Sequence, residues 1–403
     1  MRNIDDDRVA LGADVPGAGF ELPRLVLKRS ALEHNLATMA EFCRLHGVSL
    51  APHAKTTMAP KILHRQVENG AWGMTVATMQ QLRVCADSGI TTVLVANEVV
   101  DPQAAAWLGR ELVARDGVFG AFCLVDSAAG VALLSAGLQA SGLERPFPVL
   151  VEVGTIGGRA GTRSVDEALV VARSVAASPA LELAGVEGFE GVLGSTRTPE
   201  NLAKVDAFLR QMSALARRVE EAGLFREEGE VILSAGGSTF FDRAAIVLGA
   251  ADLRSPTRVV LRSGCYATHD HGSYGGPSPL GGEASQPAFV PALELWSDIL
   301  STPEPGRAIA GYGRRDAPFD AGLPVPLSRV PVGLETSPVP VVASVTGLND
   351  QHAYIDTTNA PELAVGDRLI CGIRHPCTAF DKWRKVPMVD DGYKVVEIVE
   401  TFF

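Results

Sequence analysis

The chain has 403 residues, of which 46% are hydrophobic and 21% charged, a composition typical of a folded globular protein and not of a disordered one. Its formal net charge of -11 and its lack of a lysine or arginine cluster argue against a nucleic-acid-binding surface, because phosphate recognition needs concentrated positive charge. Residues 1–7 have no apolar core of signal-peptide length, and no apolar run of about 18 residues follows, so we expect a cytoplasmic protein that binds small molecules and no membrane.

Strand-like apolar runs alternate with helical patterns between about Leu25 and Gly264, as in a parallel sheet covered by helices. Eight strands in this length favour a TIM-type (β/α)8 barrel, with a doubly wound sheet as the alternative, since periodicity cannot show closure. The predicted strands are Val48–Pro52, Met74–Ala77, Thr92–Ala96, Phe119–Val125, Pro148–Val153, Ala184–Phe189, Val231–Ser234 and Arg258–Arg262. Helices are predicted at Ala31–Cys43, Met79–Ala86, Pro102–Ala114 and Glu200–Ala222.

The amino-acid composition changes from about Gly276, where proline and glycine become frequent and helical periodicity is lost. Strand-type runs follow at Val341–Val345, Ala353–Asp356, Arg368–Cys371 and Val395–Glu400. We therefore predict a barrel over residues 25–275 and a second, β-rich domain over residues 276–403. The polar residues 1–24 either pack on the second domain or hang loose.

Lys55 follows the first predicted strand, in the segment Pro52-His-Ala-Lys-Thr-Thr57. A lysine at the mouth of a buried strand, near desolvating neighbours, can have its pKa lowered enough to attack an aldehyde. The natural aldehyde partner is pyridoxal phosphate. A surface lysine is the ordinary explanation for such a position, so the other strand ends must decide.

Polar residues follow the other predicted strands too, and the loops after strands seven and eight are where barrels commonly bind phosphate. Glycines there let the backbone approach an anion, while hydroxyl side chains and a helix start add donors. Each candidate also has an ordinary explanation. Ser238 and Thr239 could cap a helix, Arg159 could form a surface salt bridge, and Glu190 could be a solvated carboxylate at the rim. The candidates are Arg159 after strand five, Glu190 after strand six, Gly236, Gly237, Ser238 and Thr239 after strand seven, and Arg262, Gly264, Cys265 and Tyr266 after strand eight.

Six blocks spread over nearly the whole chain together resemble the fold-type III pyridoxal-phosphate enzymes of the D-serine dehydratase and D-threonine aldolase group, whose barrel is similar to that of alanine racemase. The chain most resembles the D-serine deaminase-like branch of that group. The blocks are Pro52-His-Ala-Lys-Thr-Thr57, Gly157-Gly-Arg-Ala-Gly161, Gly188-Phe-Glu-Gly191, Ser234-Ala-Gly-Gly-Ser-Thr239, Arg262-Ser-Gly-Cys-Tyr266 and His375-Pro-Cys377.

The resemblance assigns roles to the candidate residues. It implies that Lys55 holds pyridoxal phosphate covalently and that Arg159 lies near the phenolic oxygen of the cofactor. The loops Gly236–Thr239 and Gly264–Cys265 would hold the phosphate. Arg262 and Tyr266 both match residues near the pyridine ring, and the choice between them for the ring nitrogen stays open. The resemblance also implies a homodimer, in which the β-rich domain of one subunit approaches the barrel mouth of the other.

His375 and Cys377, one residue apart on a segment expected to be extended, would point to the same side and could share a metal. Spacing alone favours a non-metal explanation, because two residues are a small ligand set. The six cysteines contain no CxxC pair, which favours reduced thiols or metal ligands over disulfides. The resemblance implies zinc here, whereas an aspartate at the position of Cys377 in the aldolase branch suits manganese or magnesium.

These residues predict a metal-assisted ammonia-lyase that converts D-serine, D-threonine or a related β-hydroxy D-amino acid to a 2-oxo acid and ammonia. Lys55 is the candidate base, and His352 matches a histidine of the family's second domain; a turn network is favoured for His269 and His271 over a second metal site. Cleavage of D-threonine or 3-hydroxy-D-aspartate by an aldolase is the alternative, although many aldolase-like members carry an aspartate within the segment that here is Val153–Ile156. Racemisation is a third outcome. A non-catalytic pyridoxal-phosphate carrier would lack the second domain.

Overall fold

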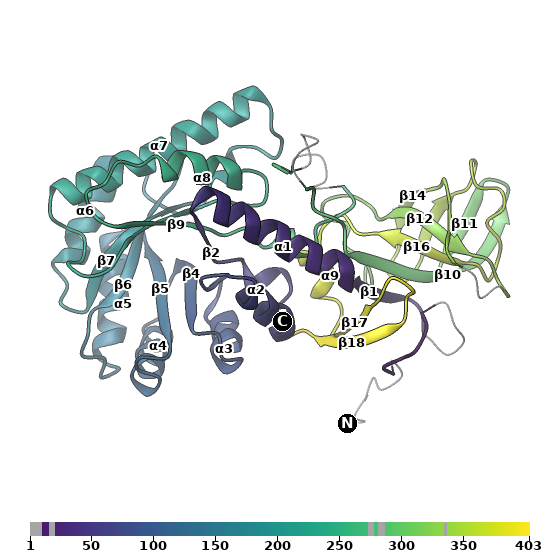
Figure 1. The fold of residues 1–403 in the computed structure, drawn as a ribbon, viewed down its shortest axis with the longest axis horizontal. Coiled ribbons are helices and arrows are strands. Elements are labelled where there is room, and N and C mark those ends of the chain that lie inside the picture. The colour runs from purple at the N-terminus through teal and green to yellow at the C-terminus, as the bar shows by residue number, and fades with distance from the viewer. Residues whose placement is uncertain (1–9, 16–20, 273–277, 281–286, 334–336) are drawn as a thin grey trace.

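The computed structural model describes residues 10–15, 21–272, 278–280, 287–333 and 337–403. Two domains lie side by side, an α/β barrel and a β-rich domain (Figure 1). Helix α1, Arg29–His46, runs between them, and the C-terminus returns to the barrel close to α2, Pro60–Glu68 (Figure 1).

The barrel consists of eight parallel strands in the order β2-β9-β8-β7-β6-β5-β4-β3. Its two end strands meet through backbone hydrogen bonds from Trp72 N to Leu50 O, at 2.8 Å, and from Thr75 N to Pro52 O, at 2.9 Å. This closure confirms the predicted TIM-type barrel over a doubly wound sheet, and every predicted strand is present. The strands are β2 (Ser49–Leu50), β3 (Met74–Val76), β4 (Thr92–Glu98), β5 (Gly120–Val125), β6 (Phe147–Val153), β7 (Leu181–Gly188), β8 (Val231–Ala235) and β9 (Thr257–Leu261).

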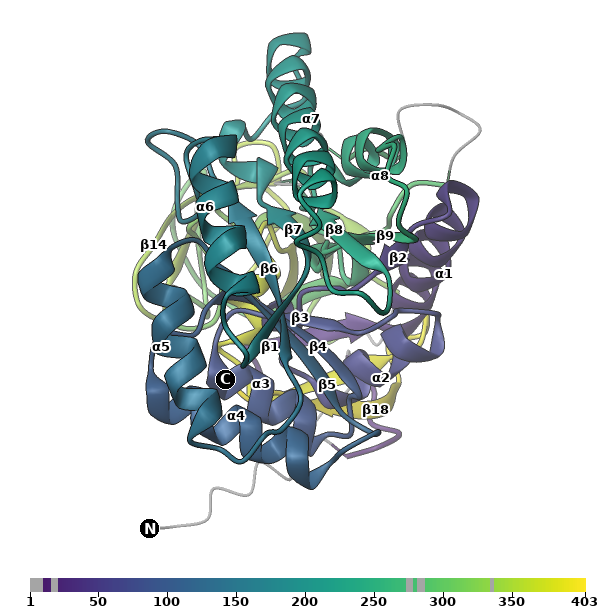
Figure 2. The same ribbon diagram turned by 90° about the vertical axis from the view of Figure 1, so that its left-hand side faces the viewer.

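Helices cover the outside of the barrel and bury their apolar faces against the strands (Figure 2). Five of them begin at a serine, threonine or aspartate whose side chain accepts a hydrogen bond from a first-turn amide, which satisfies an otherwise unpaired donor. None of the helices in the described residues is long and apolar enough to cross a bilayer. Beyond α1 and α2 the helices are α3 (Met79–Asp87), α4 (Pro102–Ala114), α5 (Ala128–Gln139), α6 (Val165–Ala176), α7 (Pro199–Glu221) and α8 (Phe241–Gly249), with short 3-10 turns η1 (Ala54–Thr56), η2 (Glu190–Leu193) and η3 (Cys265–Ala267).

The β-rich domain is a second, mostly antiparallel sheet. The strand predicted at Val341–Val345 is displaced: residues 341–343 belong to no strand, β13 ends at Pro340, which has no backbone donor, and β14 begins at Ser344. The strands are β10 (Leu293–Glu304), β11 (Arg307–Ala310), β12 (Val325–Val330), β13 (Val339–Pro340), β14 (Ser344–Leu348), β15 (Ala353–Asp356), β16 (Arg368–Gly372), β17 (Lys385–Val389) and β18 (Val395–Glu400), with the short helix α9 (Cys377–Phe380).

The start of the chain belongs to this second sheet. Strand β1, Arg24–Lys28, pairs antiparallel with β10 and parallel with β17, although residues from 25 onward were expected in the barrel. Further upstream, Gly12 N donates to Val395 O at 2.8 Å, so the described N-terminal residues pack on the β-rich domain. The apolar pattern of β1 predicts a strand but cannot identify the strand beside it.

The last strand ties the two domains together beside the first barrel loop. Glu397 on β18 forms ion pairs with Lys61, at 3.2 Å, and Arg65, at 2.7 Å, on α2. Phe402 N also donates to Met58 O, three residues after Lys55. One apolar core continues from the barrel into the second domain, so the second domain is held against the barrel end that carries Lys55.

Candidate active site

A cavity of about 650 Å³ opens at the carboxyl ends of the barrel strands. It brings together four of the predicted site residues, Lys55, Arg159, Gly237 and Arg262. The other residues that line it are His53, Ala77, Ala96, Asn97, Glu152, Ala160 and Phe189. The barrel therefore collects polar groups from several strands in one place, where chemistry in this fold occurs.

Lys55 lies on the turn η1, which follows β2 directly, and its side chain is open to this cavity. Partial burial lowers the pKa of its ammonium group, and the charges of Arg159 and Arg262 lower it further, whereas Cys377 and Cys265 oppose the shift. A lowered pKa increases the fraction of free amine, which is the nucleophilic form. The predicted reactive lysine thus has the environment that its chemistry needs.

Arg262 reaches the same cavity from the end of β9. Its Nη2 donates to Gly188 O at 2.9 Å and forms an ion pair with the buried Glu187. Its Nε is buried and has no hydrogen-bond partner in the described part of the chain. A buried donor without a partner is costly, so this group suits an acceptor on a bound ligand.

Arg159 lies with its guanidinium 4.8 Å from the ring centroid of Phe189, both on the cavity wall. No ion pair to Arg159 occurs among the residues that the structure describes, so the surface salt bridge considered above is not seen. Tyr266 lies elsewhere: its hydroxyl accepts from Gln66 Nε2 at 3.2 Å, and it lines a different, smaller cavity. Of the two candidates for the pyridine nitrogen, Arg262 therefore faces the Lys55 cavity.

The expected phosphate loops show an arrangement that the sequence did not predict. The amides of Gly236 and Gly237 donate to the buried carboxylate of Glu190, at 3.0 and 2.6 Å. By contrast, four neighbouring amides make no hydrogen bond to protein within the described residues. These belong to Ser238, Thr239, Gly264 and Cys265.

A second cavity, of about 610 Å³, is lined by Ser238, Thr239 and Glu190, and it shares Gly237 and Phe189 with the Lys55 cavity. Free amides and hydroxyls next to an amine-containing cavity fit a molecule with a phosphate at one end and an aldehyde at the other. The residues present thus fit pyridoxal phosphate, with Glu190 bracing the glycine loop.

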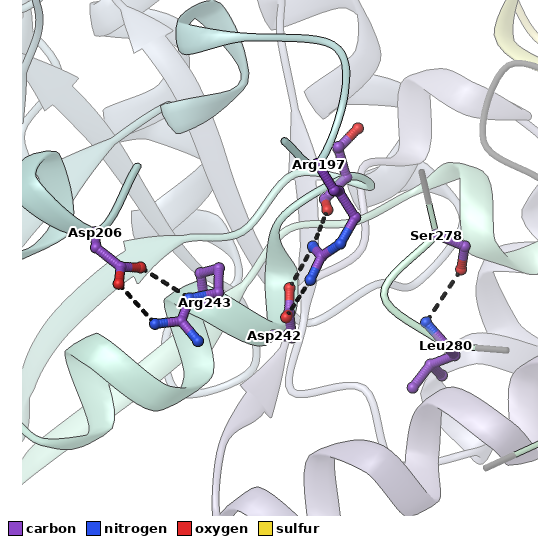
Figure 3. A network of polar contacts seen from close by, with 7 residues as sticks. Arg197, Asp206, Asp242, Arg243, Ser278 and Leu280 are labelled. Carbon is purple, nitrogen blue, oxygen red and sulfur yellow. Dashed lines mark hydrogen bonds and ion pairs between the residues drawn. The ribbon is translucent and has the colours of Figure 1, made fainter. Parts of the chain in front are cut away.

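Arg197 anchors this loop from outside (Figure 3). It donates to Thr239 O at 2.6 Å and pairs with both carboxylate oxygens of Asp242, at 2.8 and 2.6 Å. We expect Arg197→Ala to raise the dissociation constant of pyridoxal phosphate about tenfold, the equivalent of one lost charge-assisted hydrogen bond of about 1.5 kcal/mol. A fluorescence titration with the cofactor measures this.

Arg243→Ala is the matched control for Arg197→Ala. Arg243 forms a similar two-bond pair with Asp206, at 2.8 and 2.7 Å, but this pair joins α8 to α7 and does not touch the loop (Figure 3). Both variants should lower the melting temperature by a few degrees. Equal losses of cofactor affinity in the two variants would show that Arg197 has no specific role at the loop.

The distal motif differs from its predicted conformation. His375 and Cys377 were expected on an extended segment, but Pro376 has helical dihedrals and Cys377 opens α9. A proline fits this position because the first turn of a helix needs no amide donor from it. The change brings Cys377 Sγ to 3.4 Å from Thr56 Oγ1, beside Lys55, and to 3.4 Å from Cys265 Sγ.

Cys377 and His375 stabilise each other's charged forms. A hydrogen bond with Cys265 lowers the pKa of Cys377 well below its usual range, and His375 and Thr56 contribute in the same direction. The hydrogen bond with Cys377 raises the pKa of His375 to about 9. Asp320 accepts from His375 Nδ1 at 2.6 Å, so Nε2 is the ring nitrogen that would bind a metal, once the ring gives up its second proton and its hydrogen bond with Cys377.

A thiolate and an imidazole suit zinc among the common divalent ions. Within the described ranges, no three His, Cys, Asp or Glu side chains are grouped closely enough to hold a metal ion. A metal at this motif would therefore need water or substrate to complete its coordination.

The remaining predicted histidines lie outside the cavity. His352 is exposed in the turn between β14 and β15 of the second domain. His269 and His271 are partly or fully buried, and burial lowers the pKa of each to about 4. Their neutral rings lie in the loop after β9 and line no part of the Lys55 cavity.

Sequence patterns did not point to the buried carboxyl groups inside the barrel. Glu98, Glu152 and Glu187 come from the ends of β4, β6 and β7, where alternating side chains point inward. His53 was also missed as a lining residue, and burial lowers its pKa well below the usual range, so its ring is neutral. Its position two residues before Lys55 was the available signal.

Glu152 gives the protein a pH-dependent stability. Burial, repulsion from Glu187 and a hydrogen bond with Glu98 raise its pKa to about 9, although Arg159 opposes the shift. Between pH 4.5 and about 9 the folded state keeps a proton that the unfolded chain releases, so the contribution of Glu152 to stability falls as the pH rises.

The quantity to compare is the melting temperature of Glu152→Gln minus that of the unmodified protein. We expect this difference to be a few degrees larger at pH 9 than at pH 5. Thermal denaturation of the cofactor-free proteins at both values measures the difference. The same difference in melting temperature at both pH values would contradict the raised pKa of Glu152.

Comparison with known proteins divides the chain as the structure does. Residues 27–242 match the alanine racemase N-terminal domain, and residues 292–389 match the putative serine dehydratase domain. The crystal structure of D-threonine aldolase from Filomicrobium marinum is similar over 98% of each chain, with a TM-score of 0.81 and 25% identity.

Two relatives with known reactions also match. The chain is 31% identical to D-threonine aldolase from Arthrobacter sp over 368 residues, which are 88% of this chain and 86% of the relative. It is 28% identical to D-threo-3-hydroxyaspartate dehydratase from Delftia sp. (strain HT23) over 263 residues, 62% of each chain. Proteins that perform two different reactions therefore share this architecture.

Proposed function

The chain belongs to the fold-type III family of pyridoxal-phosphate lyases that joins an alanine racemase N-terminal domain to a putative serine dehydratase domain, and we propose that it eliminates water and then ammonia from a β-hydroxy D-amino acid. D-serine and D-threonine are the proposed substrates, and a 2-oxo acid and ammonia the products. The observation that supports elimination most is Cys377, a low-pKa thiol 3.4 Å from the residue next to Lys55.

Different residues of the cavity have different proposed roles toward the cofactor. Bound pyridoxal phosphate supplies an electron sink for the charge that develops at Cα of the substrate. The Lys55 amine would hold the cofactor, and its lowered pKa leaves the free amine able to accept a proton from Cα of the substrate. The amides of Ser238, Thr239, Gly264 and Cys265 would hold the phosphate, and Arg159 and Arg262, on the wall of the Lys55 cavity, would donate to the ring.

The distal motif supplies the second half of the site. Zinc held by Cys377 and His375 would supply the Lewis acidity that a poor leaving group such as hydroxide requires. Asp320 orients His375, and Thr56 fixes the thiol beside the Lys55 turn. The arrangement therefore supports a metal next to the amine and not at a remote structural site.

Aldol cleavage is the second candidate, because the similarity to D-threonine aldolase is higher and covers more of both chains than the similarity to the dehydratase. The segment Val153–Ile156 and Cys377 count against it, since the aldolase-like pattern has an aspartate in that segment and another at the position of Cys377. Incubation with D-threonine separates the two reactions, because elimination yields 2-oxobutanoate and ammonia whereas cleavage yields glycine and acetaldehyde. Cofactor binding without turnover of any D-amino acid would instead indicate a carrier protein.

We also propose a homodimer, on the basis of the resemblance. His352 does not line the Lys55 cavity of its own chain, so a catalytic role for it requires the barrel of a second copy. Sedimentation measures the mass in solution. Activity from a mixture of Lys55→Ala and His352→Ala chains, each inactive alone, would support a shared site, and a monomer of full activity would exclude it.

A further inference from the structure

Glu187 is a buried carboxylate that the proposed mechanism leaves without a role. It lies near the end of β7 and has no exposed surface. Among the described residues, it forms an ion pair with Arg262. From the part of the chain that the structure describes, neither carboxylate oxygen accepts a hydrogen bond of ordinary geometry. Burying a charge with so little compensation is expensive, so this position calls for an explanation.

The contacts of Arg262 supply that explanation. Glu187 and the carbonyl of Gly188, neighbours on β7, both hold the Nη2 end of the guanidinium, which lies 2.9 Å from Gly188 O. The planar guanidinium then has a fixed orientation, because two groups on one strand determine it. The buried donor that remains unpaired is Nε, on a side chain that lines the Lys55 cavity.

Charge leads to the same conclusion. Lys55, Arg159 and Arg262 place three cationic groups around one cavity. Glu187 neutralises one of them through a buried ion pair with Arg262, which opposes the rise that burial causes in the pKa of this carboxyl. Arg262 can thus donate a hydrogen bond to a ligand without adding a full uncompensated charge to the cavity.

We propose that Glu187 is a positioning residue, which fixes Arg262 so that its Nε–H group meets an acceptor atom on the aromatic ring of the cofactor. The inference rests on the proposed function only in requiring that pyridoxal phosphate binds in the Lys55 cavity. Glu187 touches no reacting atom itself and acts through the arginine.

A double-mutant cycle tests this role. The dissociation constant of pyridoxal phosphate and the visible absorbance of the bound cofactor are measured for Glu187→Gln, Arg262→Gln and the double variant. Glutamine keeps the size of the glutamate and a polar amide in place of the longer arginine, and the double variant leaves no unpaired charge, so it should fold even if a single variant is weakened. We expect each single change to weaken binding roughly tenfold and to shift the absorbance, and the double variant to match Arg262→Gln alone.

Glu182→Gln is the matched control, because Glu182 lies on the same strand and pairs with an arginine, Arg226, at 3.2 Å outside the cavity. It should leave the affinity and the spectrum unchanged. If Glu187→Gln weakens binding by the same factor with and without Arg262, or lowers only the melting temperature, the positioning role is wrong. If the unmodified protein binds no pyridoxal phosphate, the proposed function itself fails. If it binds the cofactor but the effects of the two substitutions add, only the positioning role fails.

Discussion

Lys55→Ala is expected to lower turnover of any D-amino acid substrate by at least about a thousandfold. The change removes both the amine that attaches the cofactor and the candidate base, and general acid–base catalysis alone contributes factors of this size. Lys55 is open to the cavity, so its truncation leaves no buried hole and should not unfold the barrel. Steady-state ammonia release measures the loss. Borohydride reduction followed by peptide mass spectrometry locates the cofactor on Lys55 in the unmodified protein.

The control for this variant is Lys204→Ala. Lys204 is an exposed lysine on α7 that pairs with Glu200 one helical turn away, an interaction that contributes little to stability. Its removal should change neither turnover nor cofactor attachment. If reduction fixes the cofactor to a lysine other than Lys55, the assignment of the cavity as the cofactor site is wrong.

Cys377→Ala is expected to reduce elimination by about a hundredfold or more while the cofactor stays attached to Lys55. The variant removes the thiolate that would bind zinc, and loss of metal ligation removes the assistance to the leaving hydroxyl. Ammonia release and the visible absorbance of the bound cofactor, measured on the same sample, separate the two effects. Treatment with a chelator should reproduce the variant in the unmodified protein.

A second substitution at this position tests the choice of metal. Cys377→Asp should shift the preference from zinc toward manganese, because a carboxylate is a harder ligand than a thiolate. Cys85→Ala is the control, since Cys85 is a buried thiol on α3 outside the site. Unchanged turnover in Cys377→Ala and after chelation would remove the metal from the mechanism.

Much of the barrel and part of the site followed from the sequence, because strand length, apolar runs and loop chemistry are local properties. All eight barrel strands were predicted, and Lys55, Arg159 and Arg262 could be placed together because barrel strands end on one face. The position of Cys377 beside Thr56 did not follow from the sequence, since 321 residues separate them and only packing brings them together.

The errors and omissions have physical reasons of the same kind. The pattern of β1 indicates a strand but not its partners, so it was grouped with the barrel and not with β10 and β17. The segment at His375 was expected to be extended because a short motif does not reveal the start of a helix four residues long. Glu190 seemed equally consistent with a rim carboxylate, and only the fold shows it bound to Gly236 and Gly237.

Zinc-dependent release of ammonia from D-serine tests the central claim most directly. The protein is treated with a chelator, loaded with pyridoxal phosphate and assayed with and without added zinc. The proposed mechanism predicts pyruvate and ammonia in equal amounts with zinc and almost none without it. Formation of glycine, or equal ammonia release in both samples, would contradict it.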